Sequence, residues 1–122
     1  MKILAGLAVL IVAALHGGFL ALEMFLWQEP TGLSVFDMTP EQAAETAVLA
    51  ANQGLYNGFL AAGLLWGLVA RKGDVITFFL LCVVVAGGYG AATASETILF
   101  VQALPGVIAL VLHFLASRQA SN

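Results

Sequence analysis

Residues 52–63 have the sequence NQGLYNGFLAAG, in which three amides and a phenol interrupt a run of apolar and small residues. On a helix that turns by about 100° per residue, Asn52, Gln53, Tyr56 and Asn57 fall within one arc of roughly 140°. Small residues recur at steps of three or four, which lets neighbouring helices approach closely. Because lipid offers amides no hydrogen-bond partner, we expect this polar arc to face protein, water or a ligand.

The composition of the whole chain indicates an integral membrane protein. Of its 122 residues, 61% are hydrophobic and only 9% are charged, compared with roughly 25% charged residues in an ordinary soluble domain. The four basic residues and the net charge of −3 do not make a nucleic-acid-binding surface. Cys82 is the single cysteine, so an intrachain disulfide is excluded.

The predicted fold is all-α: one transmembrane domain over residues 1–122, built as a bundle of four membrane-spanning helices. The spans are expected at about residues 3–27, 41–70, 75–93 and 97–117, with a short interfacial piece around residues 33–36. Thr39 and Gln42 flank Pro40 with the spacing of a capping box, which predicts where the second long helix begins.

The distribution of charge along these spans predicts the orientation of the protein. Lys2, Arg71, Lys72 and Arg118 all fall at one side of the predicted spans, and most acidic residues fall at the other. The positive-inside rule then places both termini in the cytoplasm. We therefore expect a multi-pass protein of the cell inner (cytoplasmic) membrane.

Polar residues on the predicted spans converge on one candidate pocket that opens to the outer side. His16 and Glu23 are seven residues apart, within about 20° of each other on one helix face. Counting at 1.5 Å per residue puts His16 near the midplane and Glu23 roughly 12 Å outward, where they form the floor and the mouth. Both can transfer protons. The expected lining comprises Trp27, Asn52, Gln53, Tyr56, Asn57, Tyr89 and Gln102. The alternative interpretation is that these groups only bond to each other between packed helices.

No metal site is expected from the two histidines. His16, Glu23 and His113 are spread over roughly 20 Å of helix, whereas metal ligands converge within about 2 to 2.6 Å of one ion. His113 falls near the cytoplasmic end of its span and is expected to act as a helix-end residue rather than as part of the pocket. The sequence does not identify a cofactor.

Several motifs resemble a family of small bacterial membrane proteins known only as a domain of unknown function. These are a histidine in the first span, EMFLW at residues 23–27, NQGLYNGFLAAG at residues 52–63, YGAAT at residues 89–93 and QALP at residues 102–105. The resemblance covers nearly the whole chain and implies a four-helix inner-membrane protein without an established activity. It marks the same polar positions and adds no substrate.

Three functions remain open at this point. The first is binding or transport of a small polar or amphipathic molecule, for which four short helices are expected to need a homo-oligomer. The second is an intramembrane acid-base enzyme that isomerises a lipid-like substrate, a hypothesis based on analogy with small helical sterol isomerases. The third is a structural or accessory membrane subunit. Substitution of Glu23 by Gln separates them, because only the first two need its proton or its charge.

Overall fold

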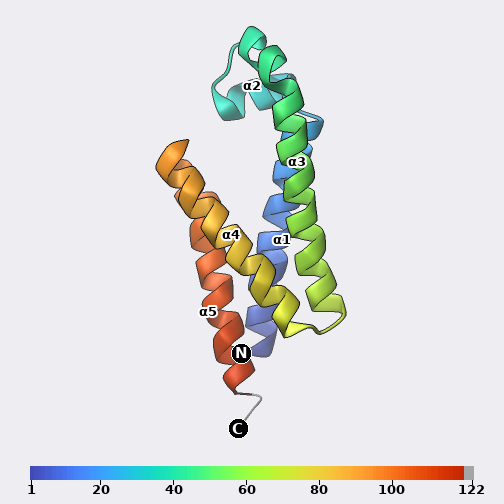
Figure 1. Cartoon of the computed structure of the whole chain (residues 1–122), viewed down its shortest axis with the longest axis vertical. Coiled ribbons are helices and arrows are strands. Elements are labelled where there is room, and N and C mark those ends of the chain that lie inside the picture. The colour runs from blue at the N-terminus through green and yellow to red at the C-terminus, as the bar shows by residue number, and fades with distance from the viewer. Residues whose placement is uncertain (120–122) are drawn as a thin grey trace. The chain divides into compact units, whose positions relative to one another are not determined.

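The computed structural model describes residues 1–119 of the chain, which are all-helical as predicted (Figure 1). Its helices are α1 (Lys2–Met24), α2 (Pro30–Phe36), α3 (Pro40–Val69), α4 (Gly73–Thr93) and α5 (Leu104–Arg118), with a π-helical segment, η1 (Leu99–Ala103), directly before α5. α2 lies where the short interfacial piece was expected. α1 ends at Met24, before the predicted boundary, because the chain turns at residues 25–29.

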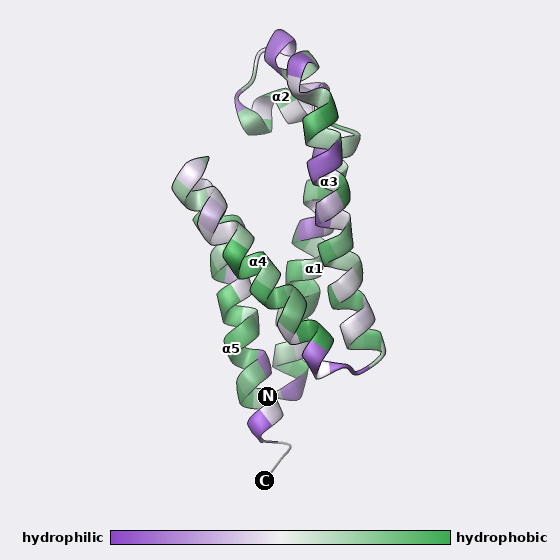
Figure 2. Cartoon of the chain, in the orientation of Figure 1, coloured by the Kyte–Doolittle hydropathy of each residue, from purple (hydrophilic) through white to green (hydrophobic). Residues whose placement is uncertain are grey.

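Three of the described helical stretches are long and apolar enough to cross a membrane: Lys2–Met24, Gly73–Thr93 and Leu99–Arg118. Figure 2 shows that apolar residues dominate α4 and α5 and that hydrophilic residues lie at the turn between α3 and α4 and near the end of α5. α3 has 30 residues, which is long enough to span. It is less apolar than these three because its middle carries Asn52, Gln53 and Asn57. The protein is thus membrane-embedded.

The two ends of α3 follow from local chemistry. Thr39 N–H donates to Gln42 Oε1 at 2.9 Å, and Gln42 N–H donates to Thr39 Oγ1 at 3.2 Å. This reciprocal pair is the predicted capping box, and α3 begins at Pro40 directly after it. At the other end Arg71 adopts φ 56°, and Lys72 N–H donates to the Gly67 carbonyl at 2.9 Å. This left-handed closing turn separates α3 from α4.

The π-helical segment η1 precedes Pro105, which lies at the beginning of α5. Proline lacks an N–H, and its ring collides with the carbonyl of the residue four positions earlier in a regular helix. A wider turn before the proline relieves that collision. Leu104 N–H accordingly donates to the Leu99 carbonyl, five residues back. Gln102 lies inside this widened turn.

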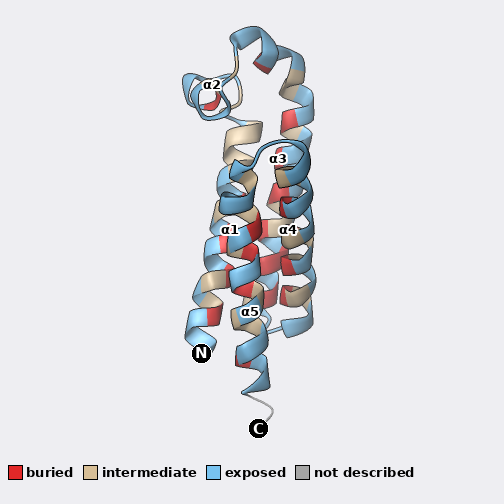
Figure 3. Cartoon of the chain, turned by 90° about the vertical axis from the view of Figure 1, so that its left-hand side faces the viewer, coloured by how far each residue is buried: buried red, intermediate tan, exposed pale blue. Residues whose placement is uncertain are grey.

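The described chain separates into two compact units. Unit 1 consists of residues 1–15 and 60–119, and unit 2 consists of residues 16–59. Figure 3 shows the buried residues of unit 1 gathered along the inner faces of its helices. Its core is formed by the first half of α1, the second half of α3, and residues of α4 and α5. The core residues are Val9, Val12, Ala13, Leu64, Ile76, Leu80, Val83 and Ala109. These positions are apolar or small, so unit 1 has a packed core.

Small residues bring α4 and the C-terminal helix together in unit 1. A Cβ atom added at Gly87 would lie 2.8 Å from the Ala103 backbone nitrogen, and one at Gly106 would lie 2.9 Å from Val83 Cγ1. Gly88, the next residue, has nothing within 4 Å of such an atom. Only one glycine of the Gly87-Gly88 pair therefore lies at the close contact.

Candidate functional site

In unit 2, α1 and α3 run antiparallel and pack closely. The contacts show this direction, because residues later in the first segment meet residues earlier in α3. Leu20 lies against Gly58, and Glu23 and Met24 lie against Gly54. Trp27, after the end of α1, contacts Thr46. A Cβ atom added at Gly54 would lie 2.7 Å from Met24 Cγ, and one at Gly58 would lie 2.5 Å from Leu20 Cδ1. The small residues of the stretch 52–63 thus allow the close approach that was predicted.

The central polar contact of this helix pair joins Glu23 to Asn57. Asn57 Nδ2 donates to Glu23 Oε2 at 3.0 Å. Asn57 is only 6% exposed, whereas the Glu23 side chain is half-buried. The absence of side-chain atoms at Gly54 and Gly58, one turn or less from Asn57, brings the two helices close enough for this bond. A carboxylate offers about four lone pairs, so a single amide bond leaves it able to accept a further donor.

A second polar contact lies nearer the α1–α3 connection. Trp27 Nε1 donates to Thr46 Oγ1 at 3.1 Å, and the Thr46 hydroxyl donates to the Gln42 carbonyl at 2.7 Å. The Trp27 ring also packs against Phe36 of α2, with ring centroids 4.7 Å apart. Trp27 therefore ties α2 and α3 to the end of α1. Thr46 was not predicted from the sequence, although its position four residues after the capping residue Gln42 is a usable signal.

His16 is fully buried, at 0% exposure, and its ring meets Phe19 edge-on at 5.3 Å. It lies two turns before Glu23 on the same helix, so both share a face of α1 as their spacing predicted. An imidazole that is shielded from solvent inside an apolar helix is costly to retain. His16 therefore remains a predicted member of the site.

The other polar residues of the predicted arc on α3 differ from Asn57 in their exposure. Asn52, Gln53 and Tyr56 are exposed, and the Tyr56 ring packs edge-on against Phe59 at 5.7 Å. The predicted arc is therefore divided. Asn57 meets α1, and the rest of the arc is open on the surface of α3. Gln53 lies one helical turn from Asn57, next to the Glu23 contact along the helix.

The two remaining predicted lining residues, Tyr89 and Gln102, belong to unit 1. Tyr89 lies in the last turns of α4 and is 73% exposed, and Gln102 is half-buried in η1. The Tyr89 carbonyl accepts a hydrogen bond from the Thr93 hydroxyl at 2.7 Å. Their membership in the pocket remains a prediction.

His113, which the sequence analysis set apart from the pocket, lies in unit 1. Its Nε2 is 3.1 Å from the Gly73 carbonyl oxygen at the start of α4. A carbonyl can only accept, so Nε2 carries the proton in this contact. His113 thus joins α5 to α4 near the ends of both helices.

These features define a small helical membrane protein with a carboxylate–amide pair inside one close helix pair. The chain belongs to the family described as "Protein of unknown function (DUF1304)", which it matches over residues 10–114. This confirms the expected kind of family. The chain is also 28% identical over 118 residues to the uncharacterized protein YpaA of Lactococcus lactis subsp. lactis (strain IL1403), covering 93% of this chain and 99% of that protein. No solved structure matches it.

Proposed function

We propose that this protein crosses the cytoplasmic membrane four times, with both termini in the cytoplasm, and binds a small polar or amphipathic molecule from the outer side. Glu23 and Asn57 form the centre of the proposed site, and the exposed amides of Asn52 and Gln53 add recognition on α3. As a carrier the protein would act as a homo-oligomer. Glu23 and His16 would link binding to proton movement.

Four crossings are supported by residues that share one pocket in unit 1. Lys2 begins α1, Arg71 follows α3 and Ser117 lies near the end of α5, and all three line this pocket. A crossing by α1 carries the chain from the Lys2 side to the opposite side. Arg71 lines the same pocket as Lys2, so the chain is again at the Lys2 side after α3, which supports a return crossing by α3. The shared pocket therefore supports a span for α3 despite its amides.

The hydrogen bond between Asn57 and Glu23 is the observation that carries the binding proposal. An ionisable carboxyl in a helix of membrane-spanning length is expensive and marks a functional site by default. The amide holds the carboxyl in one orientation and leaves some of its acceptor capacity for a ligand. A half-buried carboxyl, with an exposed Gln53 one helical turn from its partner Asn57, suits recognition of a molecule that donates hydrogen bonds.

The test compares the wild-type protein with Glu23→Gln in lipid nanodiscs. Native mass spectrometry weighs any bound molecule, and structure determination in the nanodiscs locates it. Glu45→Gln is the matched control, because Glu45 is an exposed glutamate in the first turns of α3. We expect a bound small molecule on the wild-type and Glu45→Gln proteins, and weaker binding by Glu23→Gln. If no molecule is bound, and Glu23→Gln changes nothing but stability, the helix pair is structural and the proposal is wrong.

A further inference from the structure

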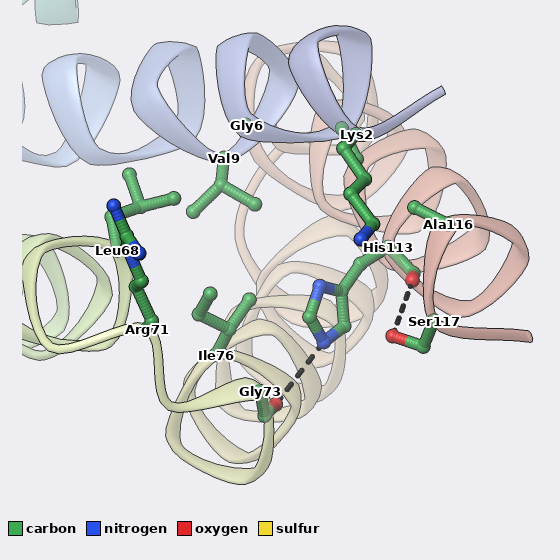
Figure 4. A pocket seen from close by; sticks show the side chains of 11 residues that line it. Lys2, Gly6, Val9, Leu68, Arg71, Gly73, Ile76, His113, Ala116 and Ser117 are labelled. Atoms are coloured by element: carbon green, nitrogen blue, oxygen red, sulfur yellow. Dashed lines mark hydrogen bonds between the residues drawn. The ribbon is translucent and has the colours of Figure 1, made fainter. Parts of the chain in front are cut away.

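A pocket of about 390 Å³ lies in unit 1, where the start of α1, the α3–α4 turn and the end of α5 come together (Figure 4). Its polar lining is Lys2, Arg71, His113 and Ser117. In Figure 4 the Lys2 and His113 side chains lie on one side of the pocket and Arg71 on the other. Apolar side chains, including Val9 and Ile76, form the walls between them.

The charge of this pocket is positive. Its eleven lining residues include a lysine and an arginine and no acidic side chain. The His113 ring is held by the bond from Nε2 to the Gly73 carbonyl, which leaves Nδ1 for a second partner. The hydroxyl of Ser117 donates to the His113 carbonyl at 2.9 Å. Two cations on opposite sides of one hollow form a site for an anion.

The position of the pocket along the helices identifies the kind of anion. Lys2, Arg71 and Ser117 mark the ends of apolar helices of membrane-spanning length or the turns between helices, the level at which lipid headgroups lie. Basic pockets between helices at this level suit phospholipid headgroups. The apolar walls continue from the charged rim toward the core of unit 1, where Val9 and Ile76 also belong to the packed cluster. A ligand with an anionic head and an apolar body matches this pocket, because the head meets the charged rim and the body meets the apolar walls.

We infer that this pocket binds the phosphate headgroup of an anionic phospholipid, with Lys2 and Arg71 contacting the phosphate and the apolar walls contacting the glycerol and the first acyl carbons. The site is separate from the proposed ligand site at Glu23 and does not depend on it. Free inorganic phosphate shares the headgroup chemistry and lacks the apolar part, so the two ligands can be told apart experimentally.

The chain offers a matched control for the charge of Arg71. Arg71→Gln removes a cation that lines the pocket, whereas Lys72→Gln removes a neighbouring cation that does not. Lys72 Nζ instead lies over the Trp66 ring, 5.4 Å from its centroid. Lys2→Gln tests the opposite side of the pocket. Gly6 also lines it, and a Cβ atom there would have nothing within 4 Å, so Gly6→Leu fills the space without a change of charge.

The experiment titrates delipidated protein in neutral detergent with phosphatidylglycerol or phosphatidylcholine and counts bound lipids by native mass spectrometry. We expect selective binding of phosphatidylglycerol. Lys2→Gln and Arg71→Gln should each weaken it about fivefold, from the roughly 1 kcal/mol that one basic residue contributes near an anionic lipid surface. Gly6→Leu should weaken binding with the charge intact, and Lys72→Gln should have little effect. Circular dichroism checks that each variant is folded.

A second titration uses inorganic phosphate, followed by phosphorus NMR. Binding of phosphate without selective binding of phosphatidylglycerol, with the same dependence on Lys2 and Arg71, would overturn the lipid as the ligand and identify a soluble anion instead. Equal binding of both lipids would overturn the inference, as would phosphatidylglycerol binding that Lys72→Gln weakens as much as Arg71→Gln does. The Glu23→Gln protein should retain the lipid, which keeps this result independent of the proposed function.

Discussion

Asn57 and its neighbours in the stretch 52–63 show how far helical spacing can predict the role of single residues. The spacing placed Asn52, Gln53, Tyr56 and Asn57 on one arc, but only Asn57 is buried against α1. An arc of roughly 140° is wider than the strip that one neighbouring helix covers, so the arc had to divide. Which part of it became buried depends on where Glu23 lies on α1, and α3 alone contains no information about that.

The strength of the Glu23–Asn57 contact can be predicted at this scale. Side-chain hydrogen bonds between membrane helices average about 0.6 kcal/mol and reach about 1.7 kcal/mol. A double-mutant cycle of Glu23→Ala and Asn57→Ala should give a coupling free energy in this range, measured by unfolding in mixed micelles. The matched pair Glu23→Ala with the exposed Asn52→Ala should give no coupling. Equal coupling for both pairs would contradict the specific contact.

At the scale of the helix, the start of α3 is held by the reciprocal bonds of Thr39 and Gln42. Loss of an N-cap hydroxyl costs about 0.5 to 2 kcal/mol. Thr39→Ala should therefore speed hydrogen exchange of the amides in the first turn of α3 by about twofold to thirtyfold, as measured by mass spectrometry. Ser34→Ala, at an exposed position of α2, should leave those amides unchanged. Unchanged exchange in Thr39→Ala would show that the capping box does not hold this end.

The contact of α4 with the C-terminal helix gives a second prediction for helices. An alanine methyl at Gly87 would meet the Ala103 backbone, which cannot rotate away as a side chain does. Gly87→Ala should therefore lower the free energy of unfolding by about 1 to 3 kcal/mol. Gly88→Ala should be neutral or raise it by up to about 1 kcal/mol, because the methyl meets nothing and the helix loses a flexible residue. Similar losses in both variants would exclude this close packing.

For the whole molecule, the number of crossings is tested by labelling single cysteines in intact cells with a membrane-impermeant maleimide. Cys82 is first replaced by Ser, and one cysteine is introduced at Ser34, Lys72 or Ser95, all exposed positions. Four spans with cytoplasmic termini predict that the Ser34 and Ser95 positions react and the Lys72 position does not. If α3 does not cross, the reactivity of the Lys72 and Ser95 positions reverses.

The sequence by itself determined the helical class, the approximate extent of the long helices, the capping box at Thr39 and the concentration of basic residues at particular helix ends. These features depend on composition and on the spacing of residues three or four positions apart. Both can be seen within the sequence of a single helix. Only the tertiary structure decided that Asn57 bonds to Glu23, that Trp27 bonds to Thr46, and that His113 lines a pocket with Lys2 and Arg71. Such contacts join distant segments, and their register depends on where small residues let helices approach.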